Sequence, residues 1–127
     1  AILVSTASML YLGMVSNEQA VVTQAARDGI ENAALALQLE YGCELGATHV
    51  GVSHGDITMS IKIRNAPPQG FTWENFRDNV VKPVLREQVL RFVEYALSGN
   101  FPEAVGPVSG RYYTYDVENI EVERVVL

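Results

Sequence analysis

Cysteine and basic residues are scarce in this chain of 127 residues. The single cysteine, Cys43, excludes an intrachain disulfide framework and a metal site built from several cysteines. The 9 lysines and arginines are outnumbered by 15 aspartates and glutamates, which gives a formal net charge of -6. This balance argues against nucleic acid or an anionic membrane as a partner, because binding to phosphate groups requires a basic surface.

The chain has no apolar run long enough for a stable membrane span. Residues 1–14 are uncharged and apolar, but a spanning helix takes about 20 residues. The stretch also lacks the basic flank of a signal peptide. We interpret it as a buried strand. The start of a helix, or the remnant of an export segment, is the alternative interpretation.

A long helix is predicted to follow this stretch. Ser16 and Gln19 have the spacing of a capping box, in which the first residue caps the helix and the second reaches back. Gly42 or Gly46 is expected to end the helix. Within the helix, small and apolar residues recur every three or four positions, which predicts one buried stripe. The stripe consists of Val22, Ala25, Ala26, Gly29, Ala33, Leu37 and Tyr41.

Two adjacent strands come next. Residues 57–64 alternate strictly between apolar and polar side chains, which indicates a strand with one buried face. Residues 48–53 show the same period, and His54, Gly55 and Asp56 between the two runs are typical of a tight turn. The sequence therefore predicts a β-hairpin.

A second helix and a last strand complete the pattern. Thr72 is expected to cap a helix that runs to about Ser98, with a kink or break at Pro83 because proline lacks the backbone N–H. Residues 112–126 form the last predicted strand, and its alternation slips by one residue near Glu118, which indicates a bulge or a short turn. The carboxylates of this strand are typical of an edge protected against aggregation.

Six elements in this order predict an α+β protein. The expected fold is a ferredoxin-like βαββαβ plait, with an antiparallel sheet and two long helices on one face. Residues 1–127 would form a single α/β-sandwich domain. The other face of the sheet would stay open, and such a face is where a domain of this kind binds ligands or partners. The likeness is to a fold pattern and not to a named family.

Residue types that carry catalysis or bind metals are present, but their spacing is unfavourable. Ser53, His54 and Asp56 are the types found in a catalytic triad, yet neighbouring residues of one turn cannot converge. His49 and His54 could bind a metal ion only if a distant carboxylate, such as Glu44 or one from the last strand, completed the site. Cys43 follows a helix, where the dipole disfavours a thiolate, so we expect an inert thiol. The sequence indicates no catalytic residue, metal or cofactor.

The best candidate for binding a ligand is the polar side of the predicted hairpin. Lys62 and Arg64 point to the same side of their strand as the polar residues of the alternating run. His49 and Ser53 are expected on the same open face. We therefore predict that His49, Ser53, Lys62 and Arg64 form a surface for a small anionic or polar ligand.

Apolar and aromatic residues in exposed positions favour an interaction role. Leu35 falls among the polar positions of the first helix, and Tyr113 and Tyr115 bring aromatic area to the last strand. Surplus apolar surface usually marks an interface. The leading hypothesis is a non-catalytic interaction or assembly module that binds a protein partner or itself through its open sheet face or an apolar helix surface.

Two alternatives stay open at this point. One is a small enzyme with a pocket at the sheet face or at a subunit interface, in which His49, His54 and Lys62 act on the substrate. The other is a secreted effector or toxin-like protein. The composition fits a soluble protein and leaves open whether it is cytoplasmic or secreted.

Overall fold

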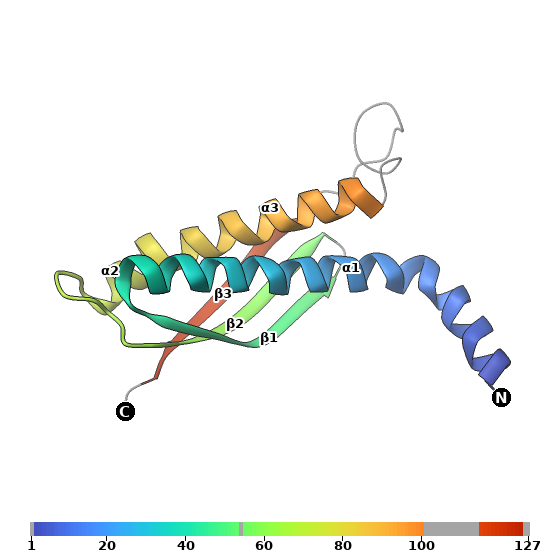
Figure 1. The fold of residues 1–127 in the computed structure, drawn as a ribbon, viewed down its shortest axis with the longest axis horizontal. Coiled ribbons are helices and arrows are strands. Elements are labelled where there is room, and N and C mark those ends of the chain that lie inside the picture. Colours follow the sequence, from blue (N-terminus) through green and yellow to red (C-terminus); the bar gives the residue numbers. More distant parts are fainter. Residues whose placement is uncertain (1, 54, 101–114, 126–127) are drawn as a thin grey trace.

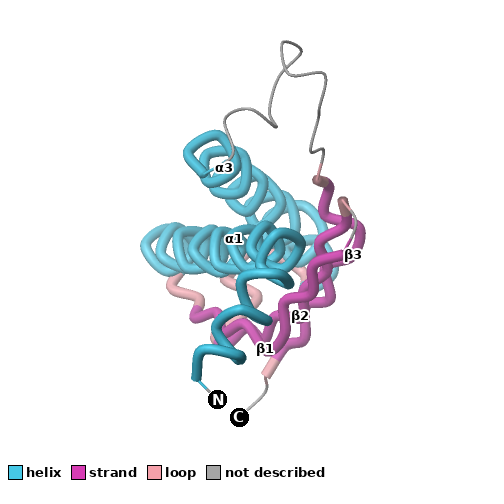
Figure 2. The backbone as a smooth tube through the Cα atoms, turned by 90° about the vertical axis from the view of Figure 1, so that its right-hand side faces the viewer, coloured by secondary structure: helices cyan, strands magenta, loops and turns pink. Residues whose placement is uncertain are grey.

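The computed structural model describes residues 2–53, 55–100 and 115–125, in the element order α1, β1, β2, α2, η1, α3, β3. A three-stranded sheet lies under two long helices, and both helices cover the same face of the sheet (Figures 1 and 2). The α+β class and the pair of helices on one face are thus as predicted. The opposite face of the sheet carries no described element.

The first helix, α1 (Ile2–Tyr41), begins much earlier than predicted. The stretch interpreted as a strand is the first part of this helix, and Ser16 lies inside the helix instead of capping it. At the other end the prediction holds. Gly42 has a φ of 73° and its N–H donates to the carbonyl oxygen of Gln38 at 2.8 Å. A left-handed residue of this kind ends many helices, and glycine adopts it without steric cost.

The predicted stripe of α1 forms one half of the core. Val22, Ala26, Ala33 and Leu37 are almost completely buried. The small residues let the backbone of α3 (Lys82–Asn100) approach closely, since a Cβ atom added to Gly29 would lie 2.7 Å from the Cα of Val89. One side-chain hydrogen bond spans the same crossing: the Nδ2 of Asn32 donates to the Oε1 of Gln88 at 2.6 Å.

The predicted hairpin is confirmed. Strands β1 (Glu44–Ser53) and β2 (Asp56–Arg64) pair antiparallel, with a bulge between Ala47 and His49. The alternation of β2 matches its burial, because its four apolar side chains are all buried against the helices. Those four are Ile57, Met59, Ile61 and Ile63.

The last strand, β3 (Asp116–Arg124), corrects the predicted plait. It pairs with β2 in parallel orientation, so the sheet order is β1-β2-β3 and the sheet is mixed. In a plait the first strand of the chain would lie between these two. Because the first segment is helical here, β3 pairs with β2 directly, and α3 provides the crossover that a parallel connection requires. The slip predicted near Glu118 is confirmed, since Ile57 pairs with Val117 and Thr58 with Asn119.

The second helical region has three parts. Helix α2 (Trp73–Phe76) is capped as predicted, because the Thr72 hydroxyl accepts from the N–H of Asn75 at 3.2 Å. A π-helical turn, η1 (Arg77–Val81), then leads into α3. Pro83 has no backbone N–H to donate to the carbonyl four residues back. Just before it, the backbone N–H of Lys82 donates to the carbonyl oxygen of Arg77, five residues back instead of four. This is the hydrogen bond of a π-helical turn.

Aromatic rings close the core at the end where α1 meets the loop before α2. The rings of Tyr41, Phe71 and Phe76 pack edge to face, with centroids 5.2–5.9 Å apart. This arrangement is the favoured one for aromatic pairs. Nearby, the guanidinium of Arg124 lies 5.3 Å from the ring centroid of Trp73, which ties the end of β3 to the start of α2.

Candidate functional site

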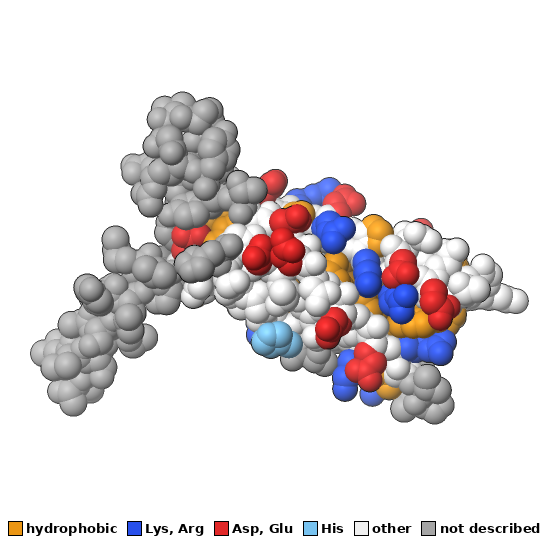
Figure 3. Space-filling view, turned by 180° about the vertical axis from the view of Figure 1, so that it is seen from behind, with side chains coloured by type: hydrophobic (Ala, Val, Ile, Leu, Met, Phe, Trp, Pro, Cys, Tyr) orange, Lys and Arg blue, Asp and Glu red, His pale blue; other side chains and the backbone are white. Residues whose placement is uncertain are grey.

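The open face of the sheet presents polar side chains in cross-strand rows. The register places Gly46, Lys62 and Glu123 in one row, and His49, Ser60 and Glu121 in another. Residues that pair across strands share a face of the sheet, so all of these point away from the helices. Figure 3 shows basic and acidic side chains interleaved on this side of the molecule, with a histidine near its margin.

A hollow of about 320 Å³ lies at one end of this face, lined by residues 44–47 of β1, by Lys62 and Arg64 of β2, and by Val125. A Cβ atom added to Gly46 would meet nothing within 4 Å, so the space above this glycine is open. Glu44 pairs directly with Arg64, and Lys62 pairs with Gly46. The absence of a side chain at Gly46 therefore opens the hollow beside the two cations.

The two cations that line the hollow, Lys62 and Arg64, are exposed to solvent. Within the described residues, neither Lys62 nor Arg64 has a carboxylate oxygen within the 4.0 Å of an ion pair. Glu44 and Glu123 are their neighbours in the register but do not close to that distance. Among the described residues, the hollow thus combines two cations that form no ion pair with a carboxylate on its β1 side.

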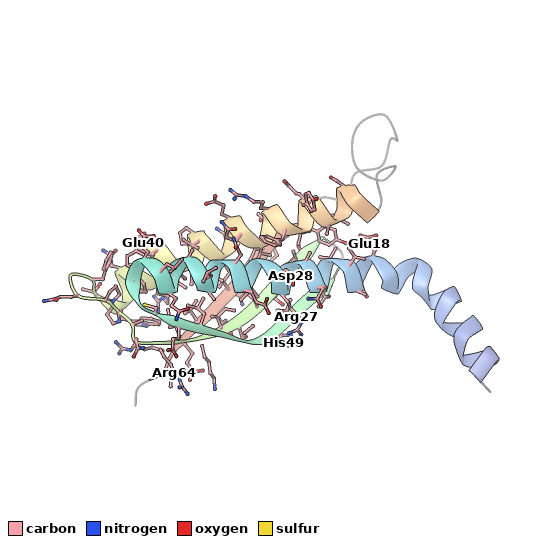
Figure 4. All side chains as sticks on the ribbon, viewed as in Figure 1. Glu18, Arg27, Asp28, Glu40, His49 and Arg64 are labelled. Atoms are coloured by element: carbon pink, nitrogen blue, oxygen red, sulfur yellow. The ribbon has the colours of Figure 1, made fainter. Side chains whose placement is uncertain are left out.

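The other two predicted ligand residues lie further along the same face. His49 pairs with Ser60, two positions from Lys62, which corresponds to about 7 Å along the strand. Figure 4 shows Arg64 at one end of the sheet, with His49 further along β1. Ser53 pairs with Asp56 at the far end, about 26 Å from Arg64. A small ligand therefore cannot touch Ser53 and Arg64 together.

His49 is held close to the surface of the sheet. A Cβ atom on Gly51 would lie 3.2 Å from its Nε2 atom and 2.9 Å from the Oγ1 of Thr58. The imidazole therefore occupies the space that Gly51 leaves. The described residues contain no group of three or more histidine, cysteine, aspartate or glutamate side chains placed to hold a metal ion. His54, the partner considered for His49, lies outside the described residues.

The helical side of the molecule carries exposed apolar residues. Leu35 is 54% exposed, and Leu39, one turn further along α1, is 80% exposed. Tyr95 on α3 is 83% exposed. Leu39 was missed by the sequence analysis, although its spacing of four from Leu35 places both side chains on one side of the helix.

The predicted interface tyrosines of the last strand have different outcomes. Tyr115 is half-buried just before β3, and its hydroxyl donates to a carboxylate oxygen of Glu18 on α1. It serves as a contact within the domain, which removes part of its surface from any interface. Tyr113 lies outside the described residues.

Cys43 is buried directly after α1. Its thiol donates to the carbonyl oxygen of Asn65 at 3.3 Å, and burial raises the pKa of the thiol. A raised pKa keeps the sulfur protonated near neutral pH, and the thiolate is the reactive form. This environment agrees with the inert thiol expected from the sequence.

We expect the thiol of Cys43 to react with Ellman's reagent at pH 8 orders of magnitude more slowly in the native protein than in urea. Reaction requires both an opening of the fold and a deprotonation that the native site disfavours. The absorbance of the released thionitrobenzoate measures both rates. A native rate close to that in urea would contradict the buried position.

Three further groups, Arg77, Asp78 and Tyr41, have shifted pKa values, and the hydrogen bond to Asp78 raises the pKa of Arg77. A bidentate contact from Arg77 lowers the pKa of Asp78, whose Oδ1 lies 2.8 Å from the Nε of Arg77. A carboxylate of this kind supports folding above its ordinary pKa and loses that effect as the pH falls through the lowered value. Desolvation raises the pKa of Tyr41. None of these three residues lines the hollow.

No protein-family model, curated protein or solved structure matches this chain. Among the helices that the structure describes, none has the length and apolar character needed to cross a membrane.

Proposed function

We propose that this protein is a non-catalytic assembly module that associates with further copies of itself through α1. The observation that supports this most directly is the amino-terminal part of α1, which continues past the end of the sheet (Figure 1). The buried residues of α1 begin only at Val22 among those described. Sequence positions 1–14, by contrast, contain no charged residue.

With 40 residues, α1 is about 60 Å long, and its second half accounts for its packing on α3 and the sheet. A helical segment that is uncharged and mostly apolar is stabilised in water when it is buried against something. Side-by-side contact between the first parts of several α1 helices removes their apolar surface from water.

The second half of α1 also carries apolar surface that a protein partner could cover. This half packs on the sheet and α3, and Leu35 and Leu39 are exposed on it. Two copies with parallel α1 helices can bury these leucines as well as the first segment. Single exposed leucines are common, but two on one side of a helix form the centre of a patch.

The expected result is concentration-dependent association of the full chain in size-exclusion chromatography with light scattering. A chain that starts at residue 18 should keep the fold, because the buried residues described begin at Val22, and it should run as a monomer. The double variant Leu35→Ser, Leu39→Ser should weaken association without lowering the melting temperature.

Tyr95→Ser provides the control, because Tyr95 is about as exposed as Leu39 but lies on α3. It should leave association unchanged. A full chain that stays monomeric at all concentrations would refute self-association through α1. If Tyr95→Ser weakens association as much as the leucine variant does, the association is non-specific and does not use a defined contact.

A further inference from the structure

The two edges of the sheet differ in how they are protected. β3 forms one edge and carries four carboxylates, at Asp116, Glu118, Glu121 and Glu123. Charged side chains of this kind keep a strand from pairing with other chains. β1 forms the other edge, has ten residues, and pairs only with β2 among the described elements. Its outer backbone groups therefore have no ladder partner in the part of the chain described.

The part of β1 before the bulge is the least protected. Residues 44–47 contain one charged side chain, and Gly46 and Ala47 are exposed. The same four residues line the hollow that holds Lys62 and Arg64. An open strand edge and two unpaired cations therefore share one site, which carries no side chain at its centre.

We infer that residues 44–47 of β1 accept an extended acidic peptide as an additional strand, with a carboxylate of that peptide over Gly46 beside Lys62 and Arg64. Main-chain hydrogen bonds would supply the affinity of such a strand, and the side-chain site would supply its specificity. Charge complementarity favours an acidic segment, because the two cations of the hollow outnumber its single carboxylate, Glu44, and none of the three forms an ion pair among the described residues. This site is separate from the α1 surface and does not depend on self-association.

Glu44 is the group that opposes an acidic ligand. It pairs with Arg64 in the register and lines the hollow, yet it forms no ion pair within 4.0 Å among the described residues. Its charge repels an incoming carboxylate and competes for Arg64. Removing that charge should therefore improve binding, which is an effect that a purely structural role of Glu44 does not produce.

The test uses the full chain and a short fluorescein-labelled peptide that alternates valine and glutamate, with anisotropy as the measurement. Lys62→Ala and Arg64→Ala together should weaken binding about tenfold, because each exposed ion pair contributes about a threefold change. Glu44→Gln should tighten binding about threefold, the effect of one exposed charge. Rising salt should weaken binding, since exposed charges are screened.

The Gly46→Val variant tests peptide binding at the hollow independently of the stability of the fold. Gly46 has open space above it and none of the positive φ values seen elsewhere in the chain, so valine fits the strand. The variant should melt no lower than the parent but lose peptide binding, because its side chain occupies the space above residue 46 where the carboxylate of the peptide would lie. Arg91→Ala is the charge control. It removes an exposed cation from an ion pair on α3 and should not affect the peptide.

Peptide chemistry distinguishes the outcomes. A peptide with alternating valine and lysine should not bind, and N-methylation of alternate amides should abolish binding of the acidic peptide by blocking the ladder. Unchanged binding of the N-methylated peptide would overturn strand addition. No binding of the acidic peptide at millimolar concentration, or equal binding to the Gly46→Val variant, would overturn the site itself.

Discussion

Replacing Phe76 with alanine is expected to lower the free energy of unfolding by about 3–5 kcal/mol. Phe76 is fully buried and its ring lies 5.2 Å from that of Tyr41 and 5.3 Å from that of Phe71. The change removes a large apolar side chain and two edge-to-face contacts, and it leaves a cavity between α1 and α2. Urea unfolding followed by circular dichroism measures the loss.

The matched comparison is Tyr95→Ala, another aromatic truncation on the same helical side of the molecule. Tyr95 is 83% exposed, so its removal should change stability by no more than about 0.5 kcal/mol. Similar losses for Phe76 and Tyr95 would contradict the packing described at the end of α1. Because domains are stable by only about 5–15 kcal/mol, the Phe76 variant should also melt well below the parent.

Replacing Gly29 with alanine is expected to destabilise the protein by about 1–3 kcal/mol, although alanine is the better helix former. The added Cβ would lie 2.7 Å from the Cα of Val89 and 2.8 Å from the carbonyl oxygen of Gln88. Both neighbours belong to the backbone of α3 and cannot rotate away. The two helices must separate, which also disturbs the Asn32–Gln88 hydrogen bond.

Gly99 offers the control with the opposite sign. It lies in α3 with nothing within 4 Å of an added Cβ, so Gly99→Ala should be neutral or stabilising by up to about 1 kcal/mol. Thermal unfolding of the two variants under one set of conditions measures the difference. If Gly29→Ala also stabilises the protein, α1 and α3 do not cross where the structure places them.

Periodicity predicted the parts of the fold that face the core. Helix α1 and strand β2 each bury one side. The buried residues recur every three or four positions in α1, from Val22 to Leu37, and every second position in β2. The slip at Glu118 was visible for the same reason, since a bulge shifts the alternation by one residue. Thr72 was found because a cap depends on local chemistry.

The direction of β3 and the start of α1 were not predictable from the same signals. A strand alternates in the same way whether its neighbour is parallel or antiparallel, so β3 alone does not reveal its orientation. Residues 1–14 are apolar at nearly every position, and such a run has no period that separates a buried strand from a helix. The capping signal at Ser16 then favoured a boundary that the helix does not have.

The candidate site was predicted in part. The spacing of Lys62 and Arg64 places both on one face of a strand, and the structure brings them together at the hollow. The role of Gly46 depends on the register between β1 and β2, which the bulge after Ala47 shifts. No local pattern reports that register, so the opening beside the cations was found only from the fold.

Amide hydrogen exchange along α1, measured by mass spectrometry at low and high protein concentration, tests the assembly proposal most directly. We expect amides from residue 22 to residue 41 to exchange slowly at both concentrations, because they belong to the packed half of the helix. Amides between residues 2 and 17 should become protected only at high concentration, as copies associate. If exchange in this first segment is independent of concentration, α1 does not join one copy of the protein to another.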